Sequence, residues 1–216
     1  MEEKAFSISL EKNPAITIKV IPGHFTTNNA HINHFIDVWE LKSNVSLARD
    51  IARELAIPYL SSTLIDTIVC MERTVVLGAY LAEELLREGT AVMNLGGQIH
   101  VVSPLSNANG NLIFQDNAIE WIRNKNILLL VASISKGGTL KIATECVEYY
   151  GGRLAGISAL FFSSEKLDYN INALFTSADI PGYKVFTTGN CEMCKAGQKL
   201  DAIISSEGYT KVAHTL

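Results

Sequence analysis

The chain has 216 residues, of which 48% are hydrophobic and 19% charged, and its formal net charge is −4. This length allows a single domain with a substantial core, and the excess of acids argues against general binding to nucleic acid phosphates. No apolar run approaches the roughly 20 residues that span a bilayer. The segment Met1-Glu2-Glu3-Lys4 lacks the basic start and apolar centre of a signal peptide, so we expect a cytoplasmic protein.

The first 40 residues combine one strand pattern with a polar, histidine-rich stretch. Residues 1–15 are expected to be an irregular lead-in, and 15–21 alternates as a strand does. His24, His31 and His34 follow. On a helix His31 and His34 would share a face, but no carboxylate or cysteine nearby completes a metal site. Capping and packing roles are therefore favoured for these histidines.

The rest of the chain alternates between strand patterns and helix patterns. This alternation predicts an α/β fold, with a central parallel sheet flanked by helices. The expected helices are 43–57, capped by Ser43 or Asn44, then 75–86 and 139–150; the expected strands are 63–70, 91–94, 98–102, 111–114, 127–132, 153–162, 171–175 and 183–186.

A short polar turn joins the expected strand 63–70 to the helix 75–86. It contains Glu72, Arg73 and Thr74. Arg73 and the Thr74 hydroxyl can donate hydrogen bonds to an anion, which indicates a second anion-binding turn. The alternative is that Glu72 and Arg73 form a solvated pair and Thr74 only caps the helix.

The most informative stretch joins a buried strand to a helix. The unbroken apolar run 127–132 is typical of a strand buried on both faces of a parallel sheet. Ser135-Lys136-Gly137-Gly138-Thr139 follows it. Glycines let backbone N–H groups approach a ligand, the helix N-terminus favours negative charge, and Ser135, Lys136 and Thr139 add donors. We predict a phosphate site here, against the alternative of an ordinary strand–helix turn.

Four cysteines divide into two kinds. Cys70 and Cys146 lie in apolar patterns and are expected to be buried, unreactive thiols. Cys191 and Cys194 form a CxxC motif, but a structural zinc needs about four ligands and no second Cys or His pair follows. We favour free thiols. A reversible disulfide, or half of a metal site shared between two copies, stays open, and no metal ligand is assigned.

The stretch LLLVASISKGGTL, residues 128–140, resembles the phosphoribosyl-pyrophosphate (PRPP) signature of type I phosphoribosyltransferases. The resemblance implies that Ser135 to Thr139 hold the 5′-phosphate and that Glu72, Arg73 and Thr74 hold pyrophosphate. In that family two acidic residues end the strand and hold the ribose hydroxyls. Here Val131-Ala132 or Ala132-Ser133 stands in their place.

Two further stretches are similar to orotate phosphoribosyltransferases. Pro22-Gly23-His24-Phe25 with Phe35-Ile36-Asp37 resembles their N-terminal hood, and the CxxC segment with Lys195 and Gly197 resembles the C-terminus of some members. The resemblance implies a hood over 1–40, a core over 41–190 and a tail over 191–216 in one domain. It also implies a homodimer, Mg²⁺ bound with PRPP, and transfer of the phosphoribosyl group to a base, of which orotate is the one favoured.

One segment departs from that pattern. Such enzymes carry a mobile catalytic loop rich in Lys and Arg, whereas residues 103–120 contain neither. The expected function is therefore phosphoribosyl transfer, and the alternative is a PRPP- or nucleotide-binding regulatory protein on the same fold. A redox or metal module centred on Cys191 and Cys194 is a third interpretation.

Overall fold

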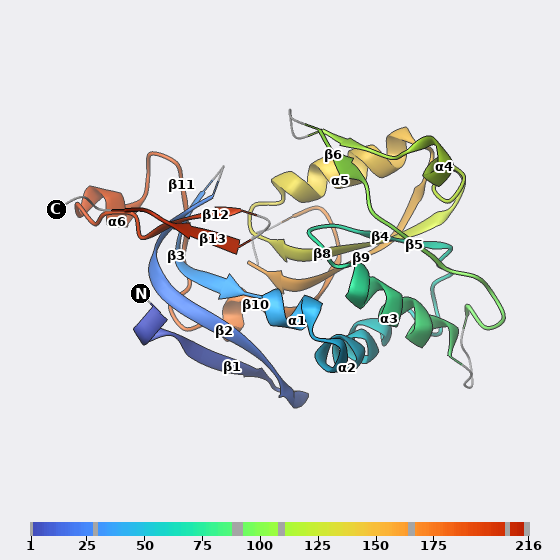
Figure 1. Ribbon diagram of the computed structural model, residues 1–216, viewed down its shortest axis with the longest axis horizontal. Coiled ribbons are helices and arrows are strands. Elements are labelled where there is room, and N and C mark those ends of the chain that lie inside the picture. Colours follow the sequence, from blue (N-terminus) through green and yellow to red (C-terminus); the bar gives the residue numbers. More distant parts are fainter. Residues whose placement is uncertain are drawn as a thin grey trace.

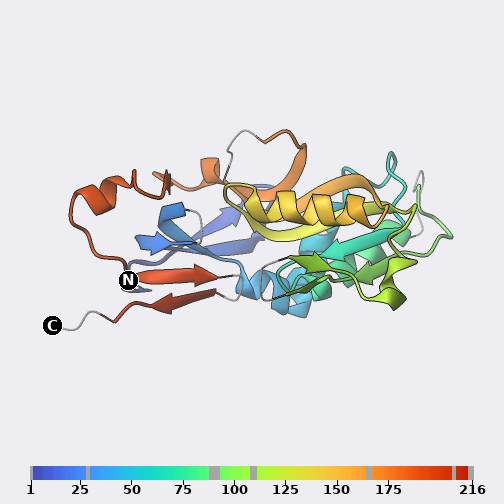
Figure 2. The same cartoon turned by 90° about the horizontal axis from the view of Figure 1, so that it is seen from above.

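The computed structural model describes residues 2–27, 30–87, 93–107, 111–163, 167–205 and 208–213. Two sheets lie side by side, one built mainly from the two ends of the chain and one from its middle (Figures 1 and 2). The helices are α1 (Trp39–Ser43), α2 (Val45–Ala56), α3 (Val75–Leu86), α4 (Asp116–Ile119), α5 (Gly138–Tyr149) and α6 (Glu192–Lys195), with 3-10 turns at Glu2–Lys4 and Ser177–Asp179.

The middle of the chain forms a five-stranded parallel sheet in the order β10-β9-β8-β4-β5. Its strands are β4 (Thr67–Cys70), β5 (His100–Val102), β8 (Asn126–Ile134), β9 (Arg153–Phe162) and β10 (Ile171–Thr176). Helices α2 and α3 cover one face and α5 the other (Figure 1). The predicted α/β class with a helix-flanked parallel sheet is confirmed.

Strand β8 shows why its sequence is apolar throughout. Successive side chains of a strand point to opposite faces. Leu128 and Leu130 therefore pack toward α2 and α3, and Leu129 and Val131 pack toward α5. Because both faces are covered, the strand needs an unbroken apolar run rather than an alternating one.

Helix α2 begins where the sequence predicts. The Asn44 side-chain oxygen accepts hydrogen bonds from the backbone N–H groups of Ser46 (3.1 Å) and Leu47 (3.4 Å). These bonds satisfy donors that have no partner within the helix. The buried face of α2 carries Ile51 and Leu55 toward the sheet.

Gly78 lets α3 approach β4 closely, and we expect Gly78→Ala to destabilise the protein. A Cβ at this position would press directly against Cys70 Sγ. Overpacking of this kind costs about 1–3 kcal/mol, which exceeds the gain of about 1 kcal/mol from alanine's helix propensity. Urea unfolding of Gly78→Ala, alone and in a Cys70→Ala background that removes the sulfur, measures the effect. An equal change in both backgrounds would contradict the proposed contact.

The two ends of the chain share the other sheet, the hood sheet. Its order is β11-β3-β2-β12-β13, with β1 also paired to β2. The strands are β1 (Phe6–Leu10), β2 (Asn13–Thr26), β3 (Ala30–Asp37), β11 (Val185–Thr187), β12 (Ala202–Ser205) and β13 (Gly208–Lys211). The C-terminal tail thus joins the N-terminal strands in one sheet: β12 pairs with β2 in parallel, and β13 pairs with β12.

Two expectations for the N-terminal region are wrong. The described part of the expected lead-in, residues 2–15, is not irregular, because β1 pairs antiparallel with β2. His31 and His34 do not share a helix face, because both lie on strand β3, where positions three apart face opposite sides. His34 packs against Tyr183 and the edge of Phe6, which fits the expected packing role.

The region between α3 and β8 is only partly as expected. Met93 and Asn94 lie in a turn rather than in the expected strand 91–94, whose first two residues are outside the described part of the chain. Short strands β6 (Leu105–Ser106) and β7 (Leu112–Ile113) form a separate antiparallel pair.

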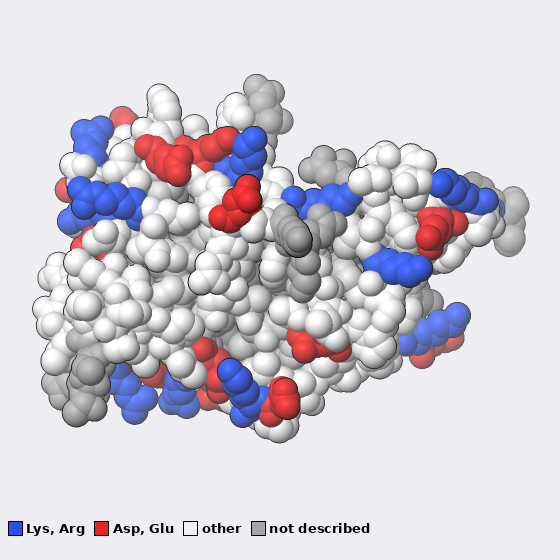
Figure 3. Space-filling model, turned by 180° about the vertical axis from the view of Figure 1, so that it is seen from behind, with Lys and Arg blue, Asp and Glu red and all other residues white. Residues whose placement is uncertain are grey.

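The charged side chains form no extended basic patch on the face seen in Figure 3, where acidic and basic residues surround a broad uncharged area. Among the described residues, no helix combines the length and apolarity needed to cross a membrane.

Candidate functional site

A cavity of about 840 Å³ opens at the carboxyl edge of the parallel sheet. Parallel strands end at the same edge, so residues that follow β4, β5 and β8 meet there. The hood sheet and the tail close the other side: Thr27, Ser205 and Gly208 all line the cavity. Ligands of open α/β sheets bind in this position, which makes the cavity the candidate site.

The turn after β8 forms one wall of the cavity. Ser135, Lys136, Gly137, Gly138 and Thr139 all line it, as the phosphate-site prediction requires. Gly137 is the N-cap of α5 and has φ = 75°, a left-handed conformation that favours glycine. The N-cap Gly137 has no side chain that could cap the helix, and unpaired N–H groups at a helix N-terminus are able to bind an anion.

The turn after β4 forms the opposite wall. Glu72 (φ = 51°) and Arg73 (φ = 62°) are both in the left-handed region, where non-glycine residues are uncommon. The Lys42 ammonium of α1 donates a 2.8 Å hydrogen bond to the Glu72 carbonyl oxygen and holds this conformation. Strained backbone of this kind clusters at ligand-binding sites.

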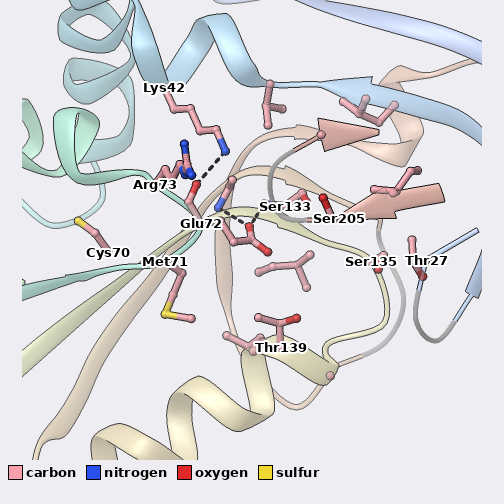
Figure 4. A pocket seen from close by; sticks show the side chains of 18 of the residues that line it. Thr27, Lys42, Cys70, Met71, Glu72, Arg73, Ser133, Ser135, Thr139 and Ser205 are labelled. Atoms are coloured by element: carbon pink, nitrogen blue, oxygen red, sulfur yellow. Dashed lines mark hydrogen bonds between the residues drawn. The ribbon is translucent and has the colours of Figure 1, made fainter. Parts of the chain in front are cut away.

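The Glu72 side chain crosses from β4 to the end of β8. Its Oε2 accepts hydrogen bonds from the backbone N–H groups of Ala132 and Ser133, each at 3.1 Å (Figure 4). Burial raises the pKa of this carboxyl, while the two N–H groups and the Lys42 charge oppose the rise. Glu72 thus brings an acidic group next to the end of β8, where this chain has Ala132 and Ser133.

The charged side chains of the cavity lie around Glu72. Figure 4 shows Lys42 and Arg73 on one side of Glu72 and the start of α5, with Thr139, on the other. Lys42 lies 5.2 Å and Arg73 6.0 Å from the centre of the Trp39 ring, so one indole orients both cations. Glu72 therefore lies between the cations Lys42 and Arg73 and the N-terminus of α5.

Two residues differ from the sequence-based expectations for this site. Thr74 does not reach the cavity: it is fully buried, and its hydroxyl donates to the carbonyl oxygens of Met71 (2.8 Å) and Leu130 (3.2 Å). Lys42 was not expected here. The sequence feature that could have indicated Lys42 is its position five residues after Phe35-Ile36-Asp37, a segment that also lines the cavity.

The cysteines separate as expected into two kinds. Cys70 and Cys146 are buried, and burial raises the pKa of the Cys70 thiol to about 12, so it stays protonated at neutral pH. Cys191 and Cys194 lie away from the cavity, where the structure brings them to His24 and His31. The histidine pair and the cysteine pair are far apart in the sequence, and neither pair alone is a complete metal site.

The fold is that of the type I phosphoribosyltransferases. No family model and no curated protein sequence matches the chain. Among solved structures, the UMP synthase of Leishmania donovani aligns over 75% of this chain with a TM-score of 0.54 and 19% identity. A phosphoribosyltransferase from Corynebacterium diphtheriae aligns over 74% of this chain and 90% of its own, with a TM-score of 0.50 and 11% identity. The chain covers 34% of the length of that UMP synthase.

Proposed function

We propose that this protein binds PRPP and transfers its phosphoribosyl group to a nucleobase, giving a nucleoside 5′-monophosphate and pyrophosphate. The observation that carries the proposal is the cavity itself. It places the open N-terminus of α5 and the Lys42–Arg73 pair on either side of one carboxylate, at the carboxyl edge of a phosphoribosyltransferase fold.

Each part of PRPP has a matching wall. The 5′-phosphate lies in the turn Ser135 to Thr139, where backbone N–H groups, the Lys136 ammonium and the helix dipole favour an anion. The pyrophosphate lies beside Lys42 and Arg73, whose charges stabilise it as it leaves with the electron pair of the ribose C–O bond. Holding both ends fixes the ribose carbon for attack by the base nitrogen.

Glu72 takes the part of the acidic pair in this proposal. Its carboxylate lies over Ala132 and Ser133, between the two anion sites. There it accepts from the ribose hydroxyls and stabilises the positive charge that develops on the ribose. Glu72 and Asp37 both line the cavity, and their oxygens fit Mg²⁺, which prefers carboxylates, phosphates and water and would enter with the pyrophosphate.

Orotate is the base we propose, on the similarity of the hood and tail segments to orotate phosphoribosyltransferases. Thr27 of the hood, with Ser205 and Gly208 of the tail, lines the cavity, and there a base would be enclosed. We also propose a homodimer in solution, which light scattering tests.

Calorimetric titration of PRPP with Mg²⁺ tests the binding step, with Lys136→Ala as the variant and Lys141→Ala as its control. Lys141 is on the same helix but pairs with Glu145 on the exposed side, so its loss should leave the affinity unchanged. Lys136→Ala should weaken PRPP binding about tenfold, because a charge-assisted contact is worth roughly 1.5–3 kcal/mol and solvent weakens it here.

Incubation with PRPP and orotate, uracil, adenine or hypoxanthine tests the transfer step by released pyrophosphate. Release with one base establishes the reaction and its substrate. Tight binding without release from any base would replace the proposed transferase with the regulatory alternative. Absence of PRPP binding would contradict the phosphate-site assignment itself.

A further inference from the structure

Four metal-ligating side chains from the two ends of the chain meet on the hood sheet. The His–Cys cluster consists of His24, His31, Cys191 and Cys194, whose ligand atoms all lie within 4.8 Å of one another. The histidines come from the β2–β3 hairpin and the cysteines from the start and end of the α6 turn. None of these four residues lines the PRPP cavity, so the cluster is a separate feature.

Local irregularity in the hairpin brings the two histidines together. The pairing of β2 with β3 shifts register between Pro22 and Phe25, which leaves His24 in a bulge. Bulges redirect side chains and are often found beside functional sites. His24 Nε2 consequently lies 3.0 Å from His31 Nδ1 on the facing strand.

Four of the six separations between these ligand atoms are short enough for one ion to bind both atoms of each pair. His24 Nε2 is 3.5 Å from each of the two sulfur atoms, and Cys194 Sγ is 3.3 Å from His31 Nδ1. Zinc bonds of about 2.3 Å to sulfur and about 2.0–2.1 Å to nitrogen place neighbouring S and N ligands about 3.5 Å apart, and two N ligands about 3.3 Å apart. The three N···S distances of 3.3–3.5 Å are near the first value, the N···N distance of 3.0 Å is shorter than the second, and the remaining pairs lie within 4.8 Å.

A backbone contact fixes the His24 ring in the form that binds a metal. Nδ1 of His24 lies 2.9 Å from the Gln198 carbonyl oxygen, which can only accept, so Nδ1 carries the proton. Nε2 therefore presents a lone pair to the cluster. In a metal-bound histidine, the ring nitrogen that does not bind the metal usually donates a hydrogen bond to a carbonyl or carboxylate oxygen.

Hydrogen bonding alone does not account for this arrangement. The single lone pair on His24 Nε2 has three neighbours within 3.5 Å, namely both sulfur atoms and His31 Nδ1, and it can accept from one of them. One cation at the centre of the cluster would be bound by all four ligand atoms at once. Two sulfur and two nitrogen ligands in a tetrahedron are the set that Zn²⁺ prefers.

We propose that His24, His31, Cys191 and Cys194 bind a structural zinc ion. Four protein ligands leave no open position for a substrate, and His24 and Cys191 are fully buried. The ion would fasten the tail to the hairpin beside a second link, in which Asp201 Oδ2 accepts from the His24 N–H at 2.7 Å. The tail then continues into β12 and β13, which supply Ser205 and Gly208 to the cavity wall.

Zinc analysis of the purified full-length chain, prepared under reducing conditions without chelators, tests the proposal. We expect close to one zinc ion per chain, and at least a tenfold loss of bound zinc in Cys194→Ser. Cys194 is exposed, so its serine variant should keep a native circular dichroism spectrum. Cys146→Ser, which removes a cysteine outside the cluster, should keep the zinc.

Two further measurements separate a metal site from a thiol pair. Co²⁺ reconstitution should give the visible and charge-transfer bands of a tetrahedral site with thiolate ligands. Removal of zinc by chelation should lower the Tm by at least about 5 °C. A chain that takes up no zinc on reconstitution, whose Tm ignores zinc, or in which Cys191 and Cys194 form a disulfide under these conditions would overturn the proposal.

Discussion

Gly137→Ala is expected to weaken PRPP binding at least tenfold, or about 1.4 kcal/mol. Gly137 has φ = 75° at the N-cap of α5, and a left-handed conformation costs an L-residue about 1–2 kcal/mol. A Cβ there would also lie 2.9 Å from Leu167 Cδ2. We expect the turn to relieve both by rotating, which would move the N–H groups that hold the phosphate in the proposed function. Calorimetric titration of PRPP measures the loss.

Gly151→Ala is the matched control for this change. Gly151 follows the C-terminus of the same helix with φ = 81°, and its Cβ would meet Arg123 Cγ at an ordinary 3.5 Å. The variant carries a similar backbone strain and should lower the Tm comparably, but it lies away from the cavity. PRPP affinity should therefore stay unchanged. Equal loss of affinity in both variants would assign the effect to general destabilisation and contradict the phosphate site.

Glu72→Gln is expected to lower phosphoribosyl transfer about 100-fold while PRPP still binds. Loss of one preorganised electrostatic contact in an active site typically costs about 10²–10³ in rate. The glutamine oxygen can still accept from the Ala132 and Ser133 N–H groups, so the turn keeps its shape and only the charge is removed. Pyrophosphate release at saturating PRPP measures the change.

The same variant should gain stability at neutral pH. Burial raises the folded-state pKa of Glu72 above its unfolded value, so the folded protein binds this proton more tightly. The carboxyl's contribution to stability is therefore present at acid pH and is lost as the pH rises through the folded-state pKa. A neutral glutamine avoids that loss, and urea unfolding at pH 7 detects the gain.

Glu145→Gln is the control for both effects, because Glu145 is an exposed residue of α5 that pairs with Lys141 across 3.8 Å and does not line the cavity. Its activity and stability should match those of the unmodified chain. Full transferase activity in Glu72→Gln would show that the Glu72 charge has no part in the reaction. A loss of stability at pH 7 would show that its burial is fully compensated.

The strands and helices around the parallel sheet were predictable because their apolar residues recur at strand or helix spacing within a short stretch of sequence. The apolar run 127–132 became β8 (Asn126–Ile134), and the helix expected at 75–86 is α3 (Val75–Leu86). Strand β1 was not predicted although its sequence FSISL alternates apolar and polar residues, because this pattern covers only five residues. The strand is mostly exposed, and pairing with β2 holds it in the sheet.

The candidate site divides in the same way. Residues 135–139 line the cavity, and the sequence could single them out because a phosphate turn would depend on glycine and hydroxyl groups that are adjacent in the chain. Lys42 and the position of the Glu72 carboxylate could not be singled out in this way. Both depend on separate segments meeting at one edge of the sheet, Lys42 from α1 and Glu72 from the end of β4.

The sequence by itself therefore determined the layered α/β core and the turn that faces the cavity, since periodicity and turn chemistry act between near neighbours. Only the tertiary structure decided how distant polar groups combine. In the sequence, no cysteine lies near His24 and His31, and no further Cys or His pair lies near Cys191 and Cys194. The parallel pairing of β12 with β2 and the bulge at His24 bring the two incomplete sets together, because long-range strand pairing, and not local pattern, fixes which ends of a chain become neighbours.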